Sequence, residues 1–101
     1  MKTVLQSIGG KEVVSDSKKI FPSINPATEE ILAYVQQGTK QDVDHAVNAA
    51  EKALPSWRAT PAPRRGELLL EIASLLKKNK QRLGKLVTQE MGKVLKEALG
   101  D

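Results

Sequence analysis

The chain has 101 residues, room for one domain at most, and sixteen basic residues against twelve acidic ones give a net charge of +4. It has no cysteine, which excludes disulfides, thiolate metal sites and a cysteine nucleophile within the chain. No apolar run approaches the roughly 20 residues that span a bilayer, and the first residues lack the apolar core of a signal peptide. We therefore expect a cytoplasmic chain with no membrane partner.

Turn-forming residues divide the first part of the chain into short strands. Gly9 and Gly10 separate VLQSI from KEVV, and such a glycine pair is typical of a β-hairpin turn. A strand over 20–24 should end at Asn25-Pro26, because proline cannot donate a hydrogen bond to a sheet. A further strand is expected over 31–35. Residues 1–37 are therefore predicted to form a β-hairpin or meander.

The rest of the chain, residues 39–101, is predicted to be helical. Thr39 is a good N-cap, and Asp42 places a carboxylate near the free N–H groups of the first turn. Four apolar residues then follow at spacings of 4, 3 and 4: Val43, Val47, Ala50 and Leu54. Pro55 removes a helical hydrogen bond, so this helix should end at Ala53 or Leu54, with Trp57 as an anchor beyond its end.

Two further helices or one long broken helix should complete the chain. Thr60-Pro61 is a strong helix start, residues 77–80 read as a connection, and Gly92 marks a second break. The apolar stripe comprises Leu68, Leu69, Ile72, Leu75 and Leu76, then Leu83, Leu86, Val87 and Met91, and finally Val94, Leu95, Ala98 and Leu99. The predicted fold class is therefore α+β, a β-hairpin/meander followed by three to four helices, in one domain over residues 1–101. The stripe still runs at Gly100-Asp101, where either Gly100 caps the helix or the sequence belongs to a longer chain.

Few residues of this sequence are candidates for catalysis or ligand binding. His45 is the only histidine and lies away from the apolar stripe of its helix, so we expect it to face solvent. Neither GxGxxG nor GxxxxGK[ST] occurs, so no phosphate loop is predicted. The basic residues between 77 and 85 could contact phosphates, but no aromatic residue lies among them to stack on bases. We expect a solvated basic face and no nucleic acid.

Two segments carry a resemblance to a known family. FPSINPATEEILAYVQQGTKQDVDHAVNAAEKALPSW (residues 21–57) and EMGKVLKEALGD (residues 90–101) resemble the N-terminal segment of the NAD(P)-dependent aldehyde dehydrogenase superfamily. This resemblance implies an incomplete part of an α/β, Rossmann-like nucleotide-binding domain. Two positions depart from the family pattern: Val94 stands where proline is frequent, and Glu12-Val13 replaces a usual tryptophan.

The resemblance also implies what the chain lacks. Complete members of the superfamily oxidise an aldehyde or semialdehyde to the carboxylic acid with NAD or NADP, through a cysteine that lies downstream of this segment. No catalytic and no cofactor-binding residue can therefore be assigned here, and the chain alone should be inactive and bind no cofactor. Its expected partners are the remainder of the dehydrogenase subunit and, once complete, further copies in a homo-oligomer.

One ligand site is implied by the same resemblance. Several relatives bind a structural cation through backbone carbonyls before the NPAT-like turn and through an acidic side chain before the GK pair. The matching positions are Ser23, Ile24 and Glu90, and oxygen ligands suit Na⁺ or Mg²⁺. In the alternative interpretation, Glu90 is a surface or helix-capping carboxylate.

Two functions of different classes follow. In the first, the chain has a structural role in a dehydrogenase whose catalytic residues lie elsewhere. In the alternative, it is a stand-alone helical module that binds a partner through the apolar stripe from Leu83 to Leu99; a small basic nucleic-acid binder is a third, weaker reading. Because much of the stripe has no partner within the chain, we expect the isolated polypeptide to be marginally stable and to self-associate.

Overall fold

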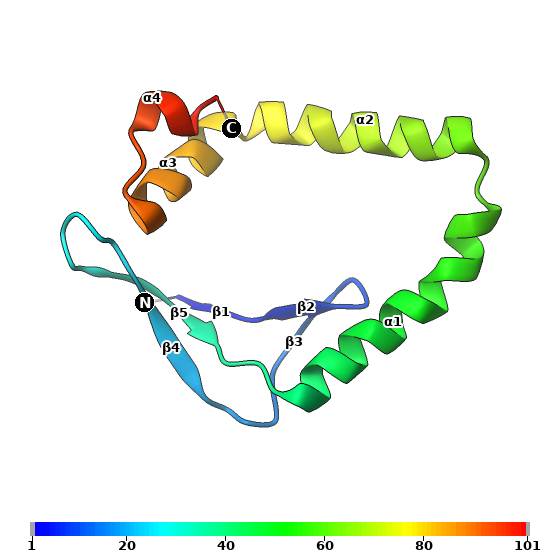
Figure 1. Ribbon diagram of the computed structural model, residues 1–101, viewed down its shortest axis with the longest axis horizontal. Helices are drawn as coiled ribbons and strands as arrows, with labels where there is room; N and C mark the ends of the chain where they lie inside the picture. Colours follow the sequence, from blue (N-terminus) through cyan, green and yellow to red (C-terminus); the bar gives the residue numbers. More distant parts are fainter. Residues whose placement is uncertain (1, 101) are drawn as a thin grey trace. The chain divides into compact units, whose positions relative to one another are not determined.

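The computed structural model describes residues 2–100, which form two compact units. The first unit holds the residues up to Ser23 together with 31–59, and the second holds 24–30 together with the residues from Thr60 onward. The strands are β1 (Thr3–Val4), β2 (Gln6–Ile8), β3 (Lys11–Val13), β4 (Ile20–Ile24) and β5 (Ile31–Gln36). The helices are α1 (Lys40–Ala59), α2 (Ala62–Lys78), α3 (Lys80–Met91) and α4 (Leu95–Ala98) (Figure 1). The α+β class with strands before helices is confirmed.

The glycine pair makes the predicted hairpin. β2 and β3 pair in antiparallel fashion with Ile8 opposite Lys11, which leaves Gly9 and Gly10 as a two-residue turn. Their φ angles are 63° and 77°. A two-residue turn whose central residues both have positive φ matches the twist of the flanking strands, and glycine adopts it without steric cost.

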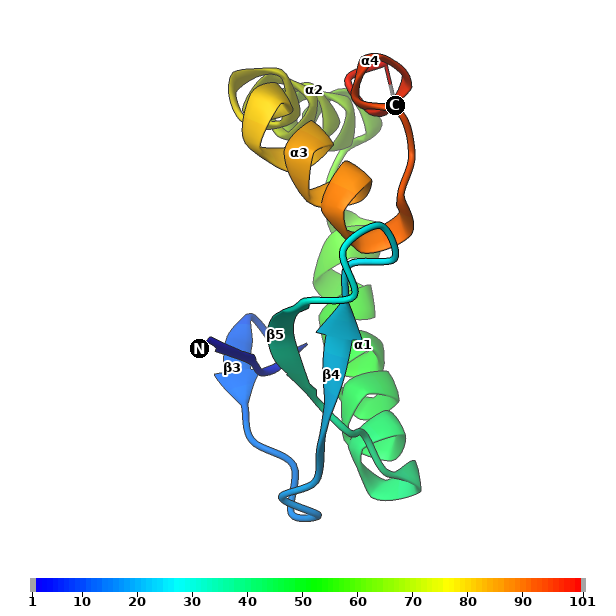
Figure 2. The ribbon, with the colours of Figure 1, turned by 90° about the vertical axis from the view of Figure 1, so that its left-hand side faces the viewer.

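The remaining strands form a separate three-stranded sheet in the order β1-β5-β4. β4 and β5 lie side by side (Figure 2). β1 runs parallel to β5, with Thr3 opposite Tyr34 and Val4 opposite Val35. The predicted pairing of strands that follow one another in sequence is therefore correct for β2–β3 and for β4–β5. It does not hold for the whole of residues 1–37, because β1 pairs with β5.

Helix α1 begins as predicted and ends later than predicted. The Thr39 hydroxyl accepts the N–H of Asp42 at 3.1 Å, which is the N-cap bond. The expected end at Ala53 or Leu54 is wrong, because α1 continues through Pro55 to Ala59. Because Pro55 has no N–H, only the carbonyl of Glu51, four residues earlier, loses its helical hydrogen bond. Glu51 is exposed, so water can hydrogen-bond to that carbonyl instead. Trp57 consequently lies inside α1, 42% exposed, and is no buried anchor.

Alanines line the side of α1 that faces the β2–β3 hairpin. The β2–β3 hairpin packs on α1, where Ala46, Ala49, Ala50 and Ala53 lie beside the Gly9-Gly10 turn. A Cβ placed on Gly9 would lie 3.8 Å from the Ala49 Cβ. The predicted stripe is mostly exposed instead: Val43 is 60%, Val47 51% and Leu54 45% exposed.

The second unit contains both predicted helix breaks, but the first is shorter than predicted, because α2 continues to Lys78 and α3 begins at Lys80. Asn79 separates α2 from α3, and its side-chain Nδ2 donates to the Leu75 carbonyl at 2.8 Å. Gly92 ends α3 in the left-handed region at φ 76°, and its N–H donates to the Thr88 carbonyl at 2.9 Å. α2 begins at Ala62, one residue later than expected, with Pro61 as N-cap residue instead of first helical residue.

Candidate functional site

A buried polar cluster lies where the β3–β4 connection meets the start of α1. The Ser15 hydroxyl donates to Asp42 Oδ2 at 2.5 Å, and the Thr39 N–H and hydroxyl donate to the same oxygen at 2.8 Å and 3.0 Å. Ser15 is 1% and Asp42 7% exposed. The Ser15 hydrogen bond, followed by those from Thr39, lowers the pKa of the Asp42 carboxyl below its ordinary value of 3.8.

This polar cluster has a structural role and not a catalytic one. Its carboxylate accepts three hydrogen bonds and carries a lowered pKa, so it is a poor general base near neutral pH. Among residues 2–100 no three His, Asp or Glu side chains gather as metal ligands would. The cluster therefore joins two parts of the first unit and positions the first turn of α1.

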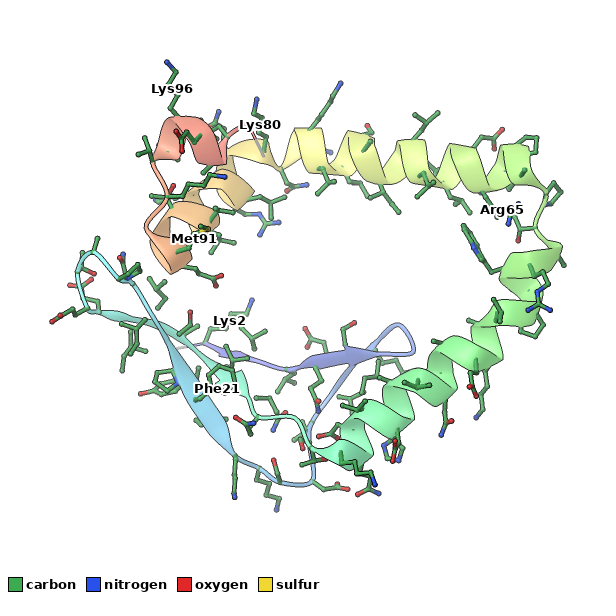
Figure 3. All side chains as sticks on the ribbon, in the orientation of Figure 1. Lys2, Phe21, Arg65, Lys80, Met91 and Lys96 are labelled. Carbon is green, nitrogen blue, oxygen red and sulfur yellow. The ribbon has the colours of Figure 1, made fainter. Side chains whose placement is uncertain are left out.

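Many large apolar side chains of the second unit are exposed. In α2, Leu69 is 61%, Leu70 72% and Leu75 60% exposed, and side chains project from α2 along its whole length (Figure 3). Within residues 2–100, Ala98 is the one apolar residue that is buried. Leu residues are normally among the most buried, so several consecutive ones left open mark a surface that another part of a protein covers.

The total surface area supports the same conclusion. The chain exposes 8150 Å². A compact folded protein of 11.0 kDa exposes about 5,600 Å², and two separate compact bodies of half that mass together expose about 6,800 Å². The surface thus exceeds the larger value, that of two separate bodies, by roughly 1,350 Å². This excess is larger than the roughly 800 Å² that one partner buries in a standard protein interface.

An apolar groove of about 510 Å³ runs between α2, α3 and α4. Its lining includes Leu76, Leu83, Val87 and Leu99, with Lys77 and Lys80 beside them. Gly84 lets α4 approach α3, since a Cβ there would lie 2.6 Å from Leu99 Cδ2. Part of the Leu83–Leu99 stripe is therefore packed within the unit, while Met91 and Val94 are 64% and 65% exposed.

The residues predicted to hold a cation lie at the NPAT-like turn and the end of α3. Ser23 is half-buried in β4, Ile24 ends β4, and the Glu90 side chain is exposed one residue before the end of α3. Ile24 and Glu90 belong to the second unit, whereas Ser23 belongs to the first. Within the second unit the turn reaches the end of α3, because a Cβ on Gly92 would lie 3.2 Å from Pro26 Cγ. Two backbone carbonyls and one carboxylate are oxygen donors that fit a hard cation.

Other residues considered from the sequence lie on the surface. His45 is exposed on α1, as expected. The basic residues between 77 and 85 are exposed at the end of α2 and along α3. In the part of the chain that the structure describes, no helix is both long and apolar enough to cross a membrane.

Comparison of the sequence with known proteins gives a consistent picture. The profile of the "Aldehyde dehydrogenase family" matches residues 13–101. Malonate-semialdehyde dehydrogenase 1 of Geobacillus kaustophilus is 44% identical over 98% of this chain, which covers 20% of that relative. The human methylmalonate-semialdehyde/malonate-semialdehyde dehydrogenase [acylating], mitochondrial, is 41% identical over 98% of this chain and 18% of its own length. The chain spans about a fifth of these relatives.

Solved structures agree with the sequence relatives. A 3,6-anhydro-L-galactose dehydrogenase in complex with NAP superposes with a TM-score of 0.95 at 35% identity, covering 98% of this chain and 21% of that one. A putative methylmalonate-semialdehyde dehydrogenase from Sinorhizobium meliloti 1021 complexed with NAD gives a TM-score of 0.91 at 32% identity, covering 99% and 20%. The family profile covers most of the sequence and the fold matches over nearly all of it, so the chain belongs to the aldehyde dehydrogenase family.

Proposed function

We propose that this chain serves as the N-terminal scaffold of an NAD(P)-dependent dehydrogenase that oxidises a semialdehyde. The observation that carries the proposal is the exposed apolar stripe of α2, where Leu69, Ile72 and Leu75 are 61%, 53% and 60% exposed. A chain that matches about a fifth of its relatives and leaves the leucines of α2 open is suited to covering a larger domain. We assign residues 1–101 to the N-terminal segment of an aldehyde dehydrogenase-like domain, an incomplete part of its nucleotide-binding domain, with the strands in 1–37 and the helices in 39–101.

The chemistry belongs to the remainder of the enzyme. This chain has no cysteine, so the nucleophile that the family uses must come from elsewhere in the subunit. NAD(P)⁺ would accept the hydride that leaves the aldehyde carbon. The names of the sequence relatives support a semialdehyde as substrate, and the two structural relatives with NAP or NAD support a nicotinamide cofactor.

The cation site forms part of the same proposal. Carbonyl oxygens of Ser23 and Ile24 and the Glu90 carboxylate would hold Na⁺ or Mg²⁺ at the NPAT-like turn, with further ligands from the rest of the subunit. Placing a cation there would fasten the turn to the end of α3. We also place the complete enzyme in the cytoplasm, as a homo-oligomer.

A chimera tests the proposed function. This chain is fused to the part of the Geobacillus kaustophilus relative that follows its matched segment, and NADH formation from malonate semialdehyde is measured with and without coenzyme A. The parallel assay is informative because the human relative is named as acylating. We expect activity within about tenfold of the unaltered relative. A truncated relative without any N-terminal segment is the control and should be inactive.

An insoluble or inactive chimera, beside an active unaltered relative, would contradict the scaffold function. A stand-alone interaction module is the second candidate, favoured by the groove that Leu83, Val87 and Leu99 line. That candidate requires the 101-residue chain to be a stable monomer by itself, which analytical ultracentrifugation decides.

A further inference from the structure

The net positive charge of this chain is concentrated in the segment that forms the apolar groove of the second unit. Residues 76–100, which include every described residue that lines the groove, contain seven cations and two carboxylates, Glu90 and Glu97. These cations are Lys77, Lys78, Lys80, Arg82, Lys85, Lys93 and Lys96. The segment thus carries +5, while the whole chain carries only +4, so the other residues sum to −1. The net positive charge of the chain therefore resides in one segment.

This segment also builds the groove. Lys77 and Lys80 line it next to Leu76 and Leu83, from the end of α2 and the start of α3. Lys80 lies at the α2–α3 junction, and Lys96 projects outward from α4 (Figure 3). Both groove lysines are exposed. The groove thus combines an apolar floor with a cationic rim.

Three kinds of occupant can be compared on charge and chemistry. A second copy of the same segment would bring +5 against +5, and its own Lys77 and Lys80 would meet the groove lysines, which repulsion disfavours. Nucleic acid would use the lysines, but the segment has no aromatic residue for base stacking and its apolar floor offers nothing to phosphates. An apolar polypeptide segment flanked by Asp or Glu would pack its apolar side chains on the floor of the groove and pair its carboxylates with the lysines of the rim.

We propose that the groove between α2, α3 and α4 binds an acidic amphipathic segment from the other part of the dehydrogenase subunit. This inference rests on the proposed function, since the occupant belongs to the polypeptide that the chain is proposed to cover. Leu83, Val87 and Leu99 would take its apolar side chains, and Lys77 and Lys80 would pair with its carboxylates. The Gly84–Leu99 approach fixes one wall of the groove, so the occupant meets a preformed shape.

Photo-crosslinking in the chimera identifies the occupant. Leu83→p-benzoylphenylalanine is introduced, the chimera is irradiated, and the attached peptide is found by mass spectrometry. We expect a peptide from the downstream part with at least two Asp or Glu residues flanking apolar ones. Attachment to a neutral or basic peptide, attachment to a second copy, or no attachment in an active chimera would overturn the inference.

Charge reversal provides the second readout. Lys77→Glu combined with Lys80→Glu should lower the crosslinking yield at least threefold in low salt, and Lys77→Gln combined with Lys80→Gln should give a smaller loss. The matched control is Lys11→Glu with Lys52→Glu, two exposed lysines of the first unit, which should leave the yield unchanged. Equal yields for the groove variant and the control would overturn the inference. If the wild-type chimera itself is insoluble or inactive, the proposed function fails instead.

Discussion

The Ser15 hydroxyl donates a hydrogen bond of 2.5 Å to Asp42 Oδ2, across 27 residues of sequence. The same carboxylate oxygen accepts two further hydrogen bonds from Thr39 at the start of α1. Asp42 N–H donates in return to the Thr39 hydroxyl, so the first turn of α1 and the β3–β4 connection share one polar cluster. The cluster sets where α1 begins relative to the strands of its own unit.

The cluster predicts a specific dependence on pH. Because hydrogen bonds lower the pKa of Asp42 in the folded state, the carboxylate stabilises the fold above its ordinary pKa of 3.8. This stabilisation is lost as the pH falls through the lower, folded-state pKa. In the chimera, Asp42→Asn should reduce protection of the α1 amides from hydrogen exchange near neutral pH and abolish that part of the acid dependence. Asp44→Asn removes the same charge from an exposed position of α1 and controls for it; equal effects of the two variants would refute the role of the cluster.

Gly84 should be required for the packing of α4 on α3. An alanine there improves helix propensity by about 1 kcal/mol, but its Cβ would lie 2.6 Å from Leu99 Cδ2. Overpacking costs about 1–3 kcal/mol, and we expect this cost to exceed the gain in helix propensity. Gly84→Ala should therefore lower the free energy of unfolding of the chimera.

Gly66→Ala is the matched control for Gly84→Ala. Gly66 lies in α2 with nothing within 4 Å of an added Cβ, so alanine should stabilise by about 1 kcal/mol. Adding Leu99→Ala should relieve the crowding at Gly84→Ala. If thermal unfolding shows both single substitutions stabilising equally, Leu99 does not pack as described.

Gly92 should resist substitution for two reasons. Its φ of 76° costs an L-residue about 1–2 kcal/mol, and an added Cβ would lie 3.2 Å from Pro26 Cγ. Gly10 has a φ of 77° with open space around it, so Gly10→Ala measures the backbone cost alone. Gly92→Ala should therefore destabilise the chimera more than Gly10→Ala in denaturant unfolding. A smaller effect at Gly92 would mean that the turn does not reach the end of α3.

Ile72 tests whether the apolar face of α2 is covered in the complete enzyme. It lies in the middle of the apolar stripe and is 53% exposed in this chain. If the rest of the subunit covers it, Ile72→Asp loses about 1.5–3 kcal/mol of burial and also buries a charge, so the chimera should lose activity and melt at lower temperature. Ser74→Asp, at an exposed position on the opposite side of the same helix, should have little effect. An active, fully stable Ile72→Asp chimera would show that this face stays in solvent.

The sequence predicted those features that depend on local chemistry. The Gly9-Gly10 turn, the cap at Thr39 and the breaks at Asn79 and Gly92 all follow from residues next to one another. The parallel pairing of β1 with β5 and the Ser15–Asp42 bond could not be predicted, because each joins residues far apart in sequence.

The helix α1 shows why pattern alone misleads. Pro55 predicts a helix end, yet an exposed helix tolerates the one missing hydrogen bond. The hydrophobic stripe predicted that Val43 and Val47 lie on the packed face of α1. The hairpin instead lies beside alanines, whose small side chains add little to a hydrophobic pattern. The cation role of Ser23, Ile24 and Glu90 stays a prediction.

The thermal unfolding of the 101-residue chain by itself, followed by circular dichroism with light scattering at low concentration, tests the central claim most directly. A chain built to be covered should give a broad transition whose position depends on protein concentration, with a mass above that of a monomer. A sharp, concentration-independent transition from a monomer would show that these units need no covering polypeptide, and would contradict the account.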